Sequence, residues 1–166
     1  ITGATHTGKT LAAQRLIEKL KYPCLSLDLL KMGLIRSGQT ALTPMDDNLL
    51  TPYLWSIASE MIKTAIENSQ HLIVEGCYVP FDWQNSFTPE YLREIRCVCL
   101  VMTEKYIRAH FDDIIARENV IEKRLTTDLT IEEALSENKR FLQGCRENCF
   151  QPVLIDEKYD IRIKID

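Results

Sequence analysis

An eight-residue run near the amino terminus has the spacing G-x4-G-K-[ST]: Gly3-Ala4-Thr5-His6-Thr7-Gly8-Lys9-Thr10. In this pattern glycines such as Gly3 and Gly8 let the backbone bend closely around an anion, and the loop N–H groups point inward at it. We expect Lys9 to reach the β- and γ-phosphates and assist their transfer, and the Thr10 hydroxyl to ligate Mg²⁺. The run therefore predicts a nucleoside triphosphate site. The alternative is a glycine-containing turn before an ordinary helix.

Two acidic residues follow short apolar runs further along the chain. Asp28 follows Leu25-Ser26-Leu27, and Glu75 follows Leu72-Ile73-Val74. Ligands of open parallel sheets bind beyond the carboxyl ends of the strands, so we expect both acids on the rim that carries the glycine-rich loop. Asp28 is predicted to be the base or substrate-orienting carboxylate, and Glu75 the acid near Mg²⁺ or its water shell. The alternatives are a helix N-cap for Asp28 and a structural lysine pair for Glu75.

These residues need a scaffold of strands that alternate with helices, which is the order the hydrophobic pattern predicts. One expected strand ends near Thr2. The others span residues 24–27, 71–75, 97–102, 153–155 and 161–165, and the last two form one strand or a pair. The expected helices span residues 9–20, 28–35, 46–67 and 104–116, and one starts with a capping box at Thr130 and Glu133. Pro52 predicts a break or a fresh start in the third helix. We expect one three-layer α/β/α domain over residues 1–166, with a truncated first strand.

The motifs resemble those of P-loop small-molecule kinases, the broad group that includes nucleoside monophosphate, shikimate and gluconate kinases. The stretch Ile73-Val74-Glu75-Gly76-Cys77-Tyr78-Val79-Pro80 is similar to the matching segment of archaeal 2-phosphoglycerate kinases. Asp28, just after the second strand, resembles the catalytic base of relatives of zeta-toxin and chloramphenicol phosphotransferase. The resemblance implies a P-loop NTPase fold with a mostly parallel five-stranded sheet, and a kinase that uses ATP and Mg²⁺. Gly76 suits a backbone that leaves room for a ligand.

Kinases of this kind usually carry a lid whose arginines close over the phosphates. Here Arg117 and Arg124 lie in a polar segment, and we expect a short lid at about residues 117–128. A planar, permanently charged guanidinium suits a transferring phosphoryl group. The alternative is that Glu118 and Glu122 pair with these arginines on a solvated helix.

The acceptor site is expected between Asp28 and the loop after Glu75. Lys31 and Arg36 follow Asp28 and are predicted to bind an anionic substrate, with surface solvation as the alternative for each. Tyr78 belongs to an aromatic-rich loop that either lines the substrate pocket or packs over the sheet edge. The resemblance also implies that the purine binds near residues 156–159. The partner is therefore expected to be a small polar or phosphorylated molecule.

Composition narrows the class of protein. The 166 residues carry a formal net charge of -4, without a basic run that would favour nucleic acid. No apolar stretch reaches the length of a membrane span. The six cysteines lack common zinc spacing and are expected to be free thiols in a cytoplasmic protein.

Two other functions stay open on the sequence. One is a nucleotide-dependent switch or NTPase without a small-molecule acceptor; the GTPase pattern N-K-x-D is absent, because Phe141 stands where Asp is needed. The other is a toxin-like kinase that acts on a nucleotide sugar.

Overall fold

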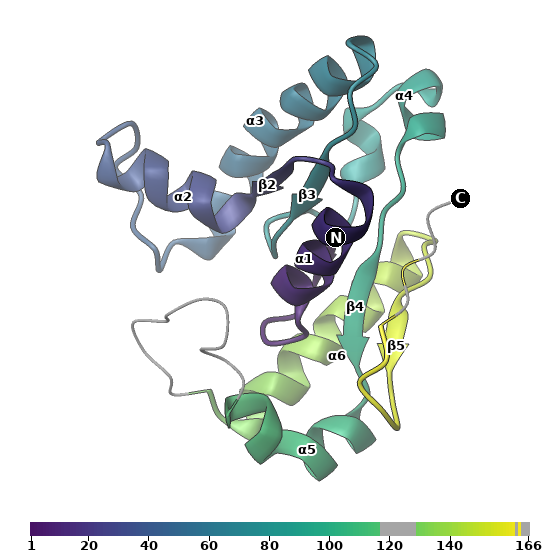
Figure 1. Ribbon diagram of the computed structural model, residues 1–166. Helices are drawn as coiled ribbons and strands as arrows, with labels where there is room; N and C mark the ends of the chain where they lie inside the picture. The colour runs from purple at the N-terminus through teal and green to yellow at the C-terminus, as the bar shows by residue number, and fades with distance from the viewer. Residues whose placement is uncertain (117–128, 162, 164–166) are drawn as a thin grey trace. The chain divides into compact units, whose positions relative to one another are not determined.

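The structure of the chain is a computed structural model, and it describes residues 1–116, 129–161 and 163 (Figure 1). The chain forms two compact units. Unit 1 comprises Ile1–Ala12 and Cys97–Asp166, and unit 2 comprises Ala13–Arg96. The predicted lid at residues 117–128, with Arg117 and Arg124, lies outside the described residues.

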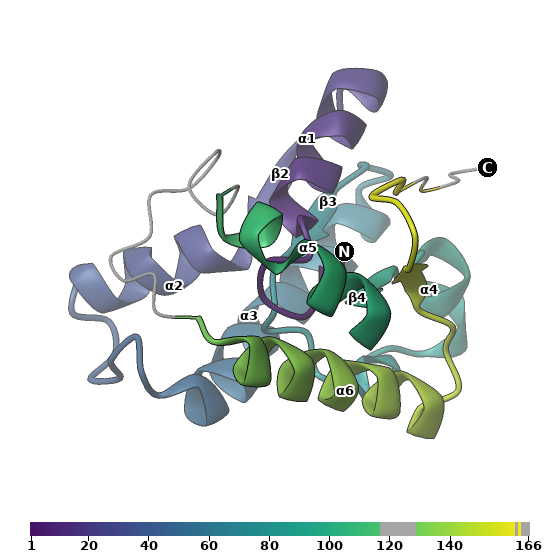
Figure 2. The same ribbon diagram turned by 90° about the horizontal axis from the view of Figure 1, so that it is seen from below.

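Unit 1 contains a parallel sheet with the strand order β1-β4-β5. The strands are β1 (Thr2–Gly3), β4 (Cys99–Met102) and β5 (Val153–Ile155), and the helices are α5 (Glu104–Ala116) and α6 (Ile131–Glu147). Helix α6 packs against both β4 and α5 (Figures 1 and 2). Apolar side chains from these strands and helices form the core: Leu100, Met102, Tyr106, Ile107, Ala134 and Ile155. The apolar run predicted as a central strand is therefore β4, which is buried along its whole length.

Unit 2 pairs β2 (Cys24–Ser26) with β3 (Ile73–Glu75) in parallel. Its helices are α2 (Leu27–Arg36), α3 (Asp47–Glu67) and α4 (Pro89–Glu94), and a 3-10 turn, η1, spans Trp83–Ser86. The long helix α3 contacts both α2 and α4. Edge-to-face contacts of Trp55 and Trp83 with Phe87, at 6.0 and 6.1 Å between ring centroids, bind α3 to the segment around η1.

Helix α1 (Lys9–Leu20) starts in unit 1 and continues into unit 2. Its bounds confirm the predicted helix at residues 9–20. The capping box of α6 is also confirmed: the Glu133 amide donates to Thr130 Oγ1 at 3.2 Å, and the Thr130 amide donates to a Glu133 carboxylate oxygen at 2.8 Å.

The predicted break at Pro52 is wrong, because α3 runs through it. The proline ring lies on the exposed side of α3. Proline has no backbone N–H, and the hydrogen bond that is lost would have gone to a carbonyl of the exposed first turn. Burial of Leu50, Leu54 and Ala58 on the other side, each 0% exposed, outweighs that loss. Tertiary packing overrides the local signal here.

The predicted single five-stranded sheet is not confirmed. In the described residues the strands are parallel, but hydrogen bonds join them as one set of three and one pair. β1 has two residues, Thr2 and Gly3, which pair with Cys99 and Leu100 of β4. Ile161 and Ile163, predicted as strand residues, are not in a strand, and the rest of that stretch includes residues outside the described part. Among the helices of the described residues, none combines the length and apolar character of a bilayer span.

Candidate functional site

The glycine-rich run forms a loop between β1 and α1, the position a phosphate-binding loop requires. Its backbone has positive φ at Gly3 (146°), His6 (64°) and Gly8 (78°). A Cβ atom at Gly3 would lie 2.2 Å from the carbonyl oxygen of Leu100 in β4, and one at Gly8 would lie 1.7 Å from the Tyr159 hydroxyl. Gly3 is therefore required by its conformation and by the close approach of the β4 backbone, and Gly8 by its conformation.

Inside the loop, the carbonyl oxygen of one residue accepts more than one hydrogen bond. The Ala4 carbonyl oxygen accepts a hydrogen bond from Thr7 Oγ1 at 2.6 Å and from the Lys9 ammonium at 2.8 Å. Lys9 is only 8% exposed, so its charge is held at the loop. This arrangement keeps an ammonium beside the inward-facing backbone, where a phosphate group would need it.

Helix α6 is hydrogen-bonded to the loop through a residue that the sequence analysis did not predict. The Thr5 amide and hydroxyl donate to the two carboxylate oxygens of Glu137 at 3.0 and 2.9 Å. The next residue, Asn138, accepts the Met102 amide of β4 at 2.8 Å. Two neighbouring residues of α6 thus fix the loop and the end of β4. Thr5 and Glu137 are 132 positions apart, so no local sequence pattern predicts their contact and only the structure identifies it.

Tyr159 lies at the second glycine of the loop. Its hydroxyl donates to the Thr7 carbonyl at 3.2 Å, and its oxygen occupies the space a Gly8 side chain would fill. The segment that the resemblance assigns to the purine therefore reaches the loop. The purine contact itself stays a prediction.

We expect Gly3→Ala to lower the free energy of unfolding by about 3 kcal/mol or more, in the upper range for single substitutions. The new methyl group would meet a backbone carbonyl of β4, which cannot turn away as a side chain can. Thermal or urea unfolding measures the loss. The matched control is Gly33→Ala in α2, where nothing lies within 4 Å of the added Cβ. Equal stability of the two variants would contradict the close approach.

Glu137→Ala is expected to weaken binding of ATP–Mg²⁺ about tenfold, equivalent to ~1.4 kcal/mol. The loop would lose the acceptor that fixes Thr5, while its own donors would remain. Glu137→Gln should retain affinity within about twofold, because an amide can accept the Thr5 N–H bond and donate to the hydroxyl. Glu132→Ala, on the exposed first turn of α6, is the control, and calorimetry reads each Kd. A Gln variant as weak as the Ala variant would show that the carboxylate charge matters instead.

In unit 2 three of the residues predicted to bind the acceptor, Asp28, Lys31 and Tyr78, form one polar cluster. Lys31 lies 3.1 Å from Asp28 Oδ1 and donates to the Tyr78 hydroxyl at 2.7 Å. That hydroxyl donates in turn to Asp47 Oδ1 at 2.9 Å. Burial, followed by the nearby Cys77 and the hydrogen bond to Asp47, raises the pKa of Tyr78 far above its usual range, so the phenol keeps its proton. Sequence reasoning missed Asp47, which lies 31 positions from Tyr78.

The alternatives for these residues are partly decided. Asp28 lies inside the first turn of α2, and Ser26 flanks the helix, so the N-cap alternative for Asp28 is wrong. Only 13% of the Lys31 side chain is exposed, which rules out simple solvation for it. Arg36 lies at the exposed end of α2, as a solvated residue would.

Glu75 is the last residue of β3 and is 2% exposed. At the neighbouring Gly76, with a φ of 148°, an added Cβ would lie 2.7 Å from the Leu27 side chain. The room that the sequence assigned to a ligand is therefore taken by Leu27, the fully buried first residue of α2. Gly76 thereby helps to fix the position of the start of α2, which carries Asp28.

The described residues contain no group of three His, Cys, Asp or Glu side chains close enough to hold a metal ion. Mg²⁺ in nucleotide sites is usually bound by one or two protein groups together with phosphates and water. Thr10 in unit 1 and Glu75 in unit 2 each offer the hard oxygen atom that this ion prefers.

No protein-family model matches the chain, and no curated protein matches it at a significant level. The likeness to P-loop kinases therefore rests on the residues of this chain alone. The loop between β1 and α1 carries most of it.

Proposed function

We propose that this chain is an ATP-dependent P-loop kinase that transfers the γ-phosphoryl group to a small-molecule acceptor. The observation that carries the proposal is the loop itself: two glycines at positive φ and a buried lysine ammonium at a strand–helix junction. The parallel pairing of the strands within each unit also supports the parallel sheet and flanking helices of a P-loop fold.

In this proposal the loop amides and the helix α1 N-terminus bind the phosphates. Lys9 leaves the Ala4 carbonyl and donates to the β- and γ-phosphates, which stabilises the charge that develops during transfer. Mg²⁺, when bound, neutralises the phosphate charge, with Thr10 and Glu75 as its protein oxygens. If Arg117 and Arg124 form a lid, they add two further positive charges.

Asp28 supplies the acid–base chemistry. Its carboxylate accepts the proton of the acceptor hydroxyl, whose oxygen then bonds to the γ-phosphorus while the bond to ADP breaks. Asp28 pairs with Lys31 and is still 36% exposed, so it remains reachable by a substrate.

ATP is proposed as the nucleotide because the base-reading motif of GTPases is absent, with Phe141 where the motif needs Asp. Asn138 there is 3% exposed and accepts the Met102 amide, and Phe141 is buried in the same helix. Both residues serve the packing of α6.

The test is a phosphoryl-transfer assay with labelled ATP, Mg²⁺ and a broad set of small-molecule acceptors. The proposal requires transfer that depends on an acceptor and that Lys9→Ala reduces about 100-fold. ATP hydrolysis at one rate with or without every acceptor would instead support an NTPase or switch.

A further inference from the structure

The charge on the cluster in unit 2 limits which acceptor it can take. Lys31 was expected to bind an anion, but its ammonium is already paired with Asp28 at 3.1 Å and hydrogen-bonded to Tyr78 at 2.7 Å. Arg36, the other expected anion ligand, lies eight residues further along α2, about 12 Å away at 1.5 Å per residue. Neither basic residue of α2 therefore offers a phosphorylated acceptor an uncommitted cation beside Asp28.

The same cluster carries a net negative charge. Two carboxylates, Asp28 and Asp47, face one ammonium, Lys31, through the neutral hydroxyl of Tyr78, giving -2 + 1 = -1. Like charges about 4 Å apart repel by roughly 1 kcal/mol in water and by about 4 kcal/mol near a protein surface. A dianionic phosphate is therefore disfavoured here, whereas a neutral hydroxyl group can donate to a carboxylate.

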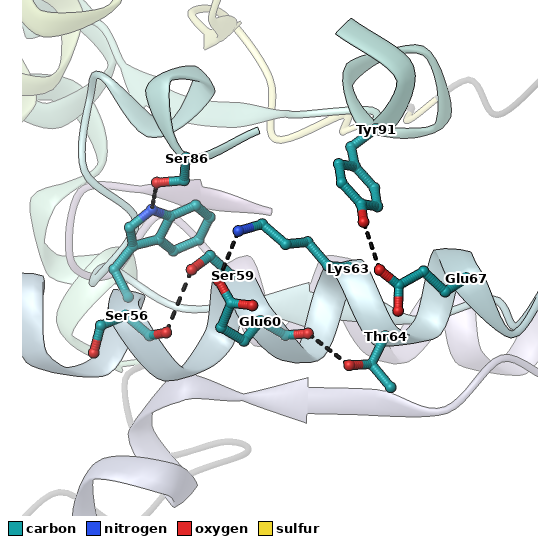
Figure 3. A network of polar contacts seen from close by, with 9 residues as sticks. Ser56, Ser59, Glu60, Lys63, Thr64, Glu67, Ser86 and Tyr91 are labelled. Carbon is teal, nitrogen blue, oxygen red and sulfur yellow. Dashed lines mark hydrogen bonds and ion pairs between the residues drawn. The ribbon is translucent and has the colours of Figure 1, made fainter. Parts of the chain in front are cut away.

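A pocket of about 360 Å³ lies in unit 2 between α3 and the segment around η1. This volume is at the lower end of the range for small-molecule sites, about 300–1,000 Å³. The residues that line it include Ser56, Ser59, Ser86, Trp55 and Asp82, and more of the lining surface is apolar than polar. None of the described residues that line it is basic. Figure 3 shows Ser56 and Ser59 on α3, opposite Ser86, which accepts the indole N–H of Trp55 at 2.9 Å.

The pocket is connected to the charged cluster through two segments, α3 and the loop after β3. In α3, the pocket residue Thr51 is one helical turn after Asp47 and donates to the Asp47 carbonyl at 3.0 Å. In the loop after β3, the pocket residue Pro80 follows two positions after Tyr78. The pocket and the carboxylate cluster therefore share two segments of unit 2, the start of α3 and the loop after β3.

We propose that the phosphoryl acceptor is an uncharged compound with one or more hydroxyl groups, bound in this pocket, and not a phosphorylated compound. The inference rests on the proposed kinase function. The Asp82 carboxylate can accept a hydrogen bond from a hydroxyl group of such a compound, and the Trp55 and proline rings match its apolar faces. Asp28 receives the proton of the hydroxyl that is phosphorylated, and ADP is the leaving group.

The experiment compares pairs of acceptors that differ only in a phosphate, such as nucleosides with their 5′-monophosphates and hexoses with their 6-phosphates. Transfer from labelled ATP is measured at equal acceptor concentrations. We expect the uncharged member of the productive pair to have a kcat/KM at least tenfold higher than its phosphorylated partner. Preference for the phosphorylated member, equal use of both, or transfer to neither overturns the inference.

A variant links the activity to the pocket. Ser56 and Thr64 are both exposed on α3, and each hydroxyl donates to its own helix, to Tyr53 O at 2.7 Å and to Glu60 O at 2.9 Å. Ser56→Leu fills the pocket and should raise the acceptor KM about tenfold. Thr64→Leu adds a similar side chain outside the pocket and should change the acceptor KM less than twofold. Equal KM values for the two variants would exclude the pocket as the acceptor site.

Calorimetry with ATP–Mg²⁺ separates this failure from failure of the kinase proposal. Ser56→Leu should keep the wild-type Kd for ATP–Mg²⁺, since the change lies in α3. If wild-type protein binds no ATP–Mg²⁺, the kinase proposal itself fails. If it binds and transfers, but only to phosphorylated compounds, the kinase stands and the acceptor inference is wrong.

Discussion

Asp28→Asn is expected to lower the rate of phosphoryl transfer at least 100-fold, while the Kd for ATP–Mg²⁺ changes less than twofold. An amide cannot take the proton of the acceptor hydroxyl, and a positioned general base contributes about 10²–10⁴-fold to a rate. The loss should appear in kcat, because the interaction is made in the transition state. Single-turnover transfer and calorimetry on the same preparation give the two quantities.

The control for this variant removes a carboxylate of the same size elsewhere. Asp112→Asn, at an exposed position of α5, should leave both the transfer rate and the Kd unchanged. If Asp28→Asn weakens ATP binding as much as it slows transfer, Asp28 supports the fold of unit 2 through its ion pair with Lys31 and is not a base.

Lys9→Ala is expected to weaken ATP–Mg²⁺ binding or transfer about 100-fold. A charged hydrogen bond to a desolvated phosphate contributes roughly 1.5–3 kcal/mol, and its loss in the transition state adds to this. The fold should survive, because the Ala4 carbonyl keeps its hydrogen bond from Thr7 Oγ1 at 2.6 Å. Circular dichroism and thermal unfolding check that condition.

Lys19→Ala is the matched control, since Lys19 is an exposed lysine in the last turn of the same helix. It should bind and transfer as the wild type does. A Lys9→Ala protein with wild-type affinity and rate would mean that the ammonium serves only the Ala4 carbonyl, and that the loop is a structural turn.

The parts of this account with a local signal were predictable from sequence. The loop from Gly3 to Thr10 is fixed by residue types at set spacings, and α1 follows it at the predicted residues. The capping box at Thr130 is another local pattern, and it is found as expected. These features depend on contacts between residues a few positions apart, so the sequence contains their cause.

The remaining features depend on contacts between distant residues. Glu137 and Asp47 are ordinary acidic residues of helices until tertiary packing brings them to Thr5 and Tyr78. The sequence predicted that Lys31 binds an anion. The structure pairs Lys31 with Asp28, and this ion pair neutralises the charge that would attract an anion. How the strands divide between sheets depends likewise on long-range pairing, which periodicity does not specify.

The central claim is that the backbone amides of the loop bind a triphosphate, and amide NMR tests it most directly. Titration of ¹⁵N-labelled protein with a non-hydrolysable ATP analogue and Mg²⁺ should move the amide signals of His6 to Thr10 most. The Thr5 amide, held by Glu137, should move less, and AMP at the same concentration should leave the signals of His6 to Thr10 nearly in place. Unchanged loop signals at millimolar analogue, with or without shifts elsewhere, would contradict the account.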